Sequence, residues 1–171
     1  VSGRVYPVLV RYAPIEQNLD QEKEEATYID ATIKTVEDLI KKRESGDILV
    51  FMPTEQDIQE TTEALRGRLA EDAVILPLFA RLSRQEQQLV FQRMAQRKIV
   101  VATNIAETSL TIPGIRFVVD SGLARISVYN PRSSTAALPI RPISKSSADQ
   151  RKGRCGRVAS GVCIRLYSEE D

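Results

Sequence analysis

Short apolar runs alternate with longer capped or periodic segments along most of this chain of 171 residues. The apolar runs are rich in Val, Ile and Leu, and they predict buried strands at 48–52, 74–78, 99–102 and 117–120. The segments between them predict helices at 29–43, from 54 onward, and from 83 to about 96. Strands that alternate with helices in this way are typical of a parallel sheet covered on both faces. We therefore expect an α/β fold.

The ends of the chain add a strand at 5–12 and a closing strand at 162–167. One segment, 126–140, breaks the alternation of helix and strand. Two extended stretches there flank a turn at 130–134, which predicts an inserted β-hairpin.

The composition is that of an ordinary globular protein, with 42% hydrophobic and 27% charged residues, and its length suits a single domain, 1–171. No apolar run is long enough to cross a membrane, and no signal-peptide pattern is present. The absence of histidine excludes histidine catalysis and a histidine-containing zinc site. Cys155 and Cys163 are expected to be small buried residues of a cytoplasmic protein. Because the chain starts at Val1, we expect it to be a piece of a longer protein.

The charge is unevenly distributed. Residues 116–165 hold ten Lys or Arg against two acids, which gives +8, whereas residues 1–100 hold fourteen against seventeen, which gives −3. A basic region on an otherwise balanced chain indicates a partner that carries phosphate. A solvated basic face is the alternative, and charge alone leaves it open.

Four Lys or Arg and two glycines crowd into residues 150–157. Ser147 and Gln150 form a capping-box pattern, which predicts a helix over 147–157. On that helix, Gln150, Arg154 and Arg157 would share one face, suited to a polyanion such as a triphosphate. Each glycine inside a helix would cost about 1 kcal/mol of stability relative to alanine. Their presence therefore indicates that another group approaches the backbone there too closely for a side chain to fit. Arg151 is expected to be solvated or structural.

Residues 150–157 resemble motif VI of superfamily 2 helicases, and the leading glutamine resembles the DEAH/RHA branch. Three further stretches resemble other motifs of that branch in the expected order: motif IV at 48–58, motif IVa at 78–83 and motif V at 102–112. The resemblance covers roughly 5–169 and is strongest to bacterial Hrp-type DEAH-box helicases. It implies a RecA-like three-layer domain, the second of two, with the hairpin inserted between motifs V and VI.

The resemblance also implies roles at the nucleotide. Arg157 would be the arginine finger, Arg154 would grip the γ-phosphate, and Gln150 would position that phosphate or the attacking water. Ser109 and Thr111 would lie near the nucleotide. Glu107 is either a carboxylate that supports the site from behind or a helix-start charge, and the second is expected. Pro113 stands where many relatives carry an aspartate that contacts the ribose, so ribose recognition is expected to differ here or to be weaker.

A second group of residues is expected at nucleic acid. Thr54, Thr103 and Asn104 follow predicted strands, so they should line one edge of the sheet, where ligands of open α/β sheets bind. The resemblance assigns them to the RNA backbone, although helix capping and turns are common uses of Thr and Asn. Thr54 stands where close relatives usually have glycine. Arg81 and Arg132 are also expected to contact RNA, Arg132 from a hairpin that would act as a strand-separating wedge.

No Gly-Lys and no Asp-Glu dipeptide occurs, so the chain lacks a P-loop and the acidic magnesium motif. The resemblance implies ATP and Mg²⁺ as cofactors. Because the two motifs are missing here, it also implies that Mg²⁺ is held by a first RecA-like domain that is not in this chain. We expect an isolated segment that is monomeric and inactive, and a full-length ATP-dependent RNA helicase that binds single-stranded RNA. A DNA translocase of the same superfamily and a catalytically inert RNA- or protein-binding module remain as alternatives.

Overall fold

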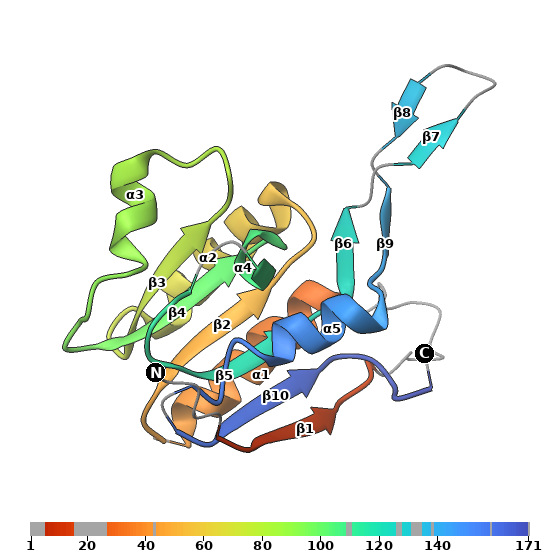
Figure 1. The fold of residues 1–171 in the computed structure, drawn as a ribbon. Coiled ribbons are helices and arrows are strands. Elements are labelled where there is room, and N and C mark those ends of the chain that lie inside the picture. Colours follow the sequence, from red (N-terminus) through yellow and green to blue (C-terminus); the bar gives the residue numbers. More distant parts are fainter. Residues whose placement is uncertain are drawn as a thin grey trace, which may run out of the picture.

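Six parallel strands form the central sheet of the computed structural model (Figure 1), which describes residues 6–15, 27–42, 44–108, 111–125, 128–130, 135–137, 139–157 and 159–170. The strand order is β1-β10-β5-β2-β4-β3. The strands are β1 (Val8–Tyr12), β2 (Asp47–Phe51), β3 (Ala73–Leu78), β4 (Arg97–Ala102), β5 (Ile115–Asp120) and β10 (Gly161–Arg165). All five pairings are parallel, so the carboxyl ends of these strands meet at one edge.

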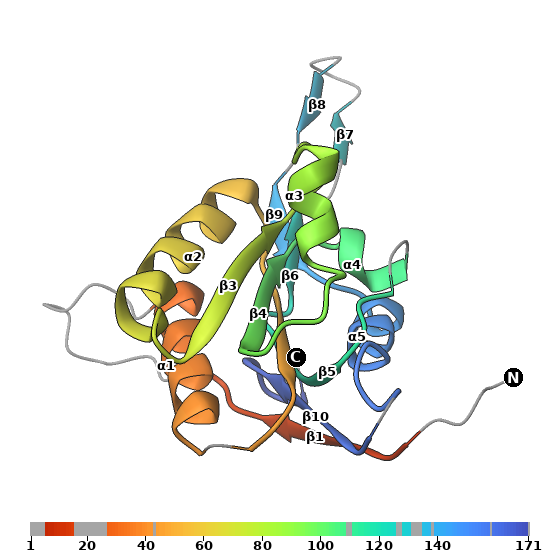
Figure 2. The same cartoon turned by 90° about the vertical axis from the view of Figure 1, so that its left-hand side faces the viewer.

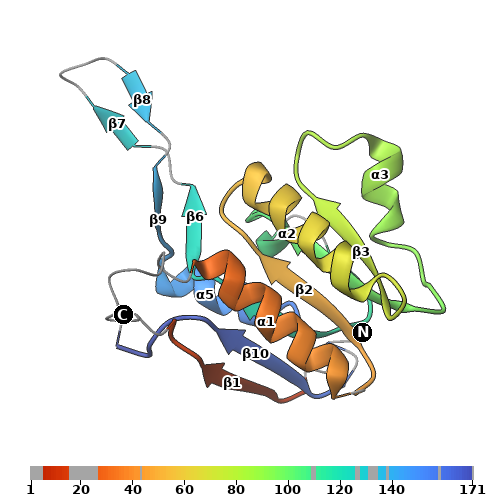
Figure 3. The same ribbon diagram turned by 180° about the vertical axis from the view of Figure 1, so that it is seen from behind.

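Helices cover both faces of the sheet, as the alternating pattern predicts. Figure 2 shows two helices on one side, α1 (Tyr28–Lys41) and α2 (Glu55–Leu69). The other side carries α3 (Arg84–Leu89), α4 (Ile105–Thr108) and α5 (Lys145–Lys152). Figure 3, from behind, shows α1 and α2 lying across the sheet. The expected RecA-like three-layer α/β architecture is confirmed.

A separate hydrophobic cluster fills the space on each side of the sheet. Alternate residues of β2 point to opposite sides, so Val50 packs with the α1 and α2 side and Leu49 with the other. Both side chains are fully buried. Burial on both faces explains why the strands read as continuous apolar runs in the sequence.

Hydroxyl side chains cap the amino ends of four helices. Thr27, Thr54, Ser83 and Ser144 each accept a hydrogen bond from the backbone N–H three residues later. The predicted helix starts at 54 and 83 are confirmed. The predicted start at Ser147 is wrong, because Ser144 is the cap. The predicted extension of the third helix to about 96 is also wrong, since α3 ends at Leu89.

The inserted hairpin has two parts. β6 (Leu123–Arg125) pairs with β9 (Ile140–Pro142), and β7 (Val128–Asn130) pairs with β8 (Thr135–Ala137), both antiparallel. The hairpin projects away from the sheet (Figure 1). The prediction is confirmed, although the hairpin begins earlier than residue 126. Its tip, including Arg132, lies outside the described residues. Among the described residues, no helix is long and apolar enough to cross a membrane.

Candidate functional site

A cavity of about 560 Å³ opens at the carboxyl ends of β2, β3 and β4, beside the base of the hairpin. The residues expected at RNA line it together: Thr54, Arg81, Thr103 and Asn104. The predicted convergence of these residues at one edge of the sheet is therefore observed. We call this hollow the strand-end cavity; its lining is Pro53, Thr54, Glu55, Gln56, Phe79, Ala80, Arg81, Thr103, Asn104, Ala124 and Arg125.

Local backbone structure fixes the polar groups of the strand-end cavity. Thr54 caps α2, because its Oγ1 accepts a hydrogen bond from Asp57 N at 3.0 Å, and the residue is only 8% exposed. Thr103 N donates to Leu78 O at 3.3 Å, which ties the end of β4 to the end of β3. Asn104 is exposed and begins the turn into α4. The hydroxyl oxygen of Thr54 therefore serves as a helix cap, as the capping interpretation expects. Its hydroxyl hydrogen can still be donated to a ligand.

Arg81 forms a two-pronged ion pair at the mouth of this cavity. Its Nε lies 3.0 Å from Glu55 Oε1 and its Nη2 lies 2.6 Å from Glu55 Oε2. The Arg81 side chain is 81% exposed, so the pair is open to solvent. The Arg81 guanidinium holds the pKa of the Glu55 carboxyl below its usual value. A phosphate that binds Arg81 must therefore displace this carboxylate or share the guanidinium with it.

Arg125 is a cavity residue that the sequence analysis missed. It lies at the end of β6 and brings a second exposed cation to the cavity from the base of the hairpin. Nothing in its local sequence distinguishes it from the other basic residues of 116–165. Arg125 belongs to β6, which pairs with β9 through Arg125 and Ile140, so the hairpin begins before residue 126. This pairing, which the sequence did not predict, accompanies the position of Arg125 in the cavity lining.

Arg154 and Arg157 of the motif VI stretch do not lie on a helix. α5 ends at Lys152 with Gly153 as its C-cap, and Arg154 and Arg157 follow in a turn over 153–157, here called the arginine turn. The prediction of a single helical face is therefore wrong. Each side chain instead folds back along the chain: Arg154 Nε donates to Gln150 O at 3.3 Å, and Arg157 Nε donates to Gly153 O at 3.0 Å.

Gly156 explains why the helix cannot continue. Its φ is +79°, which belongs to the left-handed region, and a Cβ there would lie 2.6 Å from Val8 Cγ2 and 2.8 Å from Tyr6 O. Tyr6 N also donates to Gly156 O at 2.7 Å. The close backbone approach indicated by the glycines is therefore an approach to the start of β1, within the chain itself.

Electrostatics distinguish the two arginines of this turn. Arg157 is exposed, whereas Arg154 is partly buried. Burial lowers the pKa of Arg154, and the neighbouring Arg157 charge lowers it further. The charges of Arg154 and Arg157 repel each other, and the Glu107 carboxylate offsets part of this repulsion at Arg154. A polyanion bound at the arginine turn would offset more of it.

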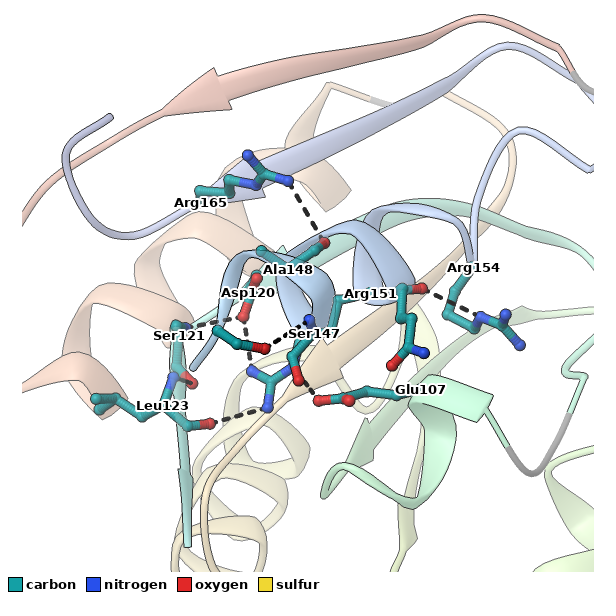
Figure 4. Close-up of polar contacts among 12 residues, drawn as sticks. Glu107, Asp120, Ser121, Leu123, Ser147, Ala148, Arg151, Arg154 and Arg165 are labelled. Atoms are coloured by element: carbon teal, nitrogen blue, oxygen red, sulfur yellow. Dashed lines mark hydrogen bonds and ion pairs between the residues drawn. The ribbon is translucent and has the colours of Figure 1, made fainter. Parts of the chain in front are cut away.

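Arg151 is completely buried between two carboxylates, as the close-up in Figure 4 shows. Its Nε donates to Glu107 Oε1 and its Nη1 to Asp120 Oδ1, both at 2.8 Å. Arg151 is thus structural and not solvated. Glu107 lies in the first turn of α4, as expected of a helix-start charge, and its side chain, which is 9% exposed, also pairs with Arg151.

The remaining expected residues have simpler surroundings. Thr111 is exposed in the loop between α4 and β5, and Ser109 lies outside the described residues. Cys155 and Cys163 are buried, as predicted. Burial raises the pKa of the Cys155 thiol to about 11 and that of Cys163 to about 12. Such thiols stay protonated at neutral pH and are poor nucleophiles.

The six-stranded parallel sheet with helices on both faces defines the class of chain as a RecA-like α/β domain. The chain belongs to the family of the helicase conserved C-terminal domain, whose model matches residues 31–159.

Similar proteins agree with that membership. The chain is 53% identical over 171 residues to the ATP-dependent RNA helicase HrpA of Escherichia coli, covering 100% of this chain and 13% of that protein. A homologue of HrpA from Haemophilus influenzae is 52% identical with the same coverage. The crystal structure of the E. coli DExH-box NTPase HrpB superposes with a TM-score of 0.82 and 36% identity, covering 98% of this chain and 20% of that one. The predicted resemblance to Hrp-type DEAH helicases is confirmed, and the chain spans only about an eighth of the length of these curated relatives.

Proposed function

We propose that this chain is the second RecA-like half of an ATP-dependent RNA helicase and works inside a longer protein. The names of its relatives and the small share of their length that it spans support this proposal. The chain has neither a Gly-Lys nor an Asp-Glu dipeptide. The other RecA-like domain would supply the P-loop lysine and the carboxylates that hold Mg²⁺. The bound Mg²⁺ would neutralise charge on the phosphates of ATP.

The observation that carries the proposal is the convergence of polar and basic groups in the strand-end cavity. Thr54, Thr103 and Asn104 offer short side chains and backbone groups, which suit phosphate and sugar contacts that do not read bases. Arg81 and Arg125 add two exposed guanidinium groups, each able to pair phosphate oxygens bidentately. Arg132 remains a prediction for an RNA contact at the hairpin tip.

The arginine turn is the proposed contribution to ATP hydrolysis. Arg157 would stabilise the charge that develops on the transferring γ-phosphoryl group, as an arginine finger does. Arg154 would bind the γ-phosphate, and Gln150 would orient that phosphate or the attacking water. Ser109 and Thr111 would lie beside the nucleotide. The exposure of Arg157 supports this role, because a finger must reach a nucleotide held by another domain.

The two alternatives predict different behaviour. A DNA translocase would use the same arginine turn but respond to DNA. A catalytically inert binding module has no need of Arg154 and Arg157 placed together in one turn. We propose that the isolated domain is monomeric, that the protein is cytoplasmic and that single-stranded RNA is its partner.

The test compares ATP turnover by the purified chain 1–171 and by the full-length protein, each with and without single-stranded RNA. We expect no turnover from 1–171, because its sequence holds no P-loop, and RNA-stimulated turnover from the full-length protein. Stimulation by single-stranded DNA alone would favour the translocase. Absence of turnover from the full-length protein with either nucleic acid would favour the binding module.

A further inference from the structure

Helix α5, which leads into the arginine turn, is attached to the rest of the fold in an unusual way. Of its eight residues, Lys145–Lys152, only Arg151 is buried. A surface helix normally packs through an apolar stripe, and α5 has none. Two guanidinium groups therefore make the directional contacts that hold α5 beside the sheet. Arg165 of β10 donates from Nη2 to Ala148 O at 3.4 Å, and the buried Arg151 of α5 makes the larger set of contacts.

Those contacts reach four separate elements. Besides Glu107 in α4 and Asp120 at the end of β5, Arg151 Nη2 donates to Leu123 O in β6 at 3.0 Å. The guanidinium carbon lies 4.8 Å from the centre of the Phe51 ring at the end of β2. Figure 4 shows Glu107, Asp120 and Leu123 converging on Arg151 from different elements. One side chain thus joins α5 to α4, the helix within motif V, to the sheet and to the base of the hairpin.

Two of these partners, Glu107 and Leu123, belong to elements that contain or directly follow residues of the strand-end cavity. Glu107 N donates to Asn104 O at 3.0 Å, so the carboxylate sits on the same short helix that starts from the cavity residues Thr103 and Asn104. Leu123 begins the strand that carries Arg125 into the cavity. A shift of these elements on nucleic-acid binding would therefore be transmitted directly to Arg151.

Asp120 strengthens this connection from the sheet side. Its Oδ1 also accepts a hydrogen bond from Gly122 N at 2.8 Å, and its Oδ2 accepts one from Tyr167 OH at 3.2 Å. Asp120 is 0% exposed, as is the Arg151 side chain. Because both groups are buried, the ion pair is restricted to a narrow range of distances and angles. A misaligned pair would leave a buried charge without a partner.

We propose that Arg151 is a positioning residue, which fixes the arginine turn relative to α4, the helix within motif V, and to the hairpin base, and so links the RNA contacts to ATP hydrolysis. This proposal rests on the proposed function, which assigns RNA to the strand-end cavity and ATP to the arginine turn. Arg151 itself touches neither ligand. It acts by holding Arg154 and Arg157 at the orientation that the transition state requires.

Four variants of the full-length protein test this role. Arg151→Lys keeps the charge but loses the planar fork that bridges Glu107, Asp120 and Leu123 O. Glu107→Gln keeps the arginine paired with Asp120 and removes only the negative charge from its link to α4. The double variant measures their coupling, and Lys152→Gln is the control, one residue further along the same helix.

The readouts are RNA-stimulated ATP turnover per bound nucleotide, KM for ATP, and hydrogen exchange of the backbone amides of 153–155. We expect Arg151→Lys to lower turnover about tenfold or more, with KM changed by less than about threefold, because the loss lies in transition-state geometry. The amides of 153–155 should exchange about tenfold faster. Glu107→Gln should act in the same direction, and the double variant should lose little beyond Arg151→Lys.

Turnover per bound nucleotide and amide exchange equal to those of Lys152→Gln would overturn the proposal. So would a fall in turnover that follows only the fraction of protein able to bind nucleotide, since that is a loss of folding. If the unsubstituted protein shows no RNA-stimulated turnover, the proposed function fails. Exchange at 153–155 then decides the role of Arg151: faster exchange in Arg151→Lys supports it, and unchanged exchange overturns it.

Discussion

The strand-end cavity and the arginine turn are held in place by different kinds of interaction. The cavity is built from strand ends and a helix start, and a neutral cap at Thr54 and a solvent-exposed ion pair at Arg81 complete it. The arginine turn follows a polar helix that is anchored by the fully buried Arg151. Losing a cap or an exposed pair is a small change in free energy, whereas losing one partner of a buried pair is a large one.

This difference indicates how each region can change its ligand contacts. A phosphate can displace Glu55 from Arg81 with little rearrangement, because both side chains are already solvated. The arginine turn has no such freedom, since its position is coupled to Glu107, Asp120 and the hairpin base. The cavity is therefore suited to a strand that must move through it, and the turn to a chemical step that needs fixed geometry.

The largest expected effect on stability is at the buried pair. Asp120→Ala leaves the Arg151 guanidinium with one carboxylate fewer in a buried site and should lower the free energy of unfolding of 1–171 by about 3–5 kcal/mol. Urea denaturation measures this loss. Asp120→Asn keeps the shape and the acceptor oxygen, so it should lose less. If Asp120→Ala costs no more than an exposed substitution, the buried pair does not anchor α5.

A smaller effect is expected at the mouth of the cavity. In the full-length protein, Arg81→Ala should weaken RNA binding at every sequence tested and reduce the slope of log K against log salt by about 1. The control is Arg84→Ala, an exposed arginine of α3 that does not line the cavity. Equal salt slopes for the two variants would remove Arg81 from the RNA interface.

The smallest expected effect is at the cap. Thr54→Ala should lower the free energy of unfolding of 1–171 by about 1 kcal/mol, because Asp57 N loses its acceptor. Thr54→Ser keeps the hydroxyl and should stay close to the unsubstituted chain. A loss from Thr54→Ala as large as that from Asp120→Ala would mean that the two regions are held equally strongly, and the comparison would fail.

The sheet and the cavity could be predicted because their signals are local. Apolar runs such as 48–52 specify buried strands, and Thr54 and Ser83 show helix starts by their spacing to the residues they cap. In a parallel sheet the strand ends must then meet at one edge. The position of Arg125 could not be predicted, because it depends on the register of the hairpin, which no local pattern fixes.

The motif VI region misled sequence reasoning for a physical reason. The spacing of Gln150, Arg154 and Arg157 fits a helix, but Gly156 must adopt a positive φ to pass close to Tyr6, which is far away in the sequence. The burial of Arg151 was hidden in the same way. Its partners Glu107 and Asp120 are 44 and 31 residues distant, and only the fold brings them together.

The most direct test of the account is the substitution Arg157→Ala in the full-length protein, with ATP binding and RNA-stimulated turnover measured on the same preparation. If Arg157 is the arginine finger, we expect Arg157→Ala to lower turnover about a thousandfold or more while ATP and RNA binding are largely kept, because the finger acts on transition-state charge. Arg157→Lys should fail as well, since a point charge cannot replace the bidentate fork. Turnover near that of the unsubstituted protein in Arg157→Ala would contradict the account.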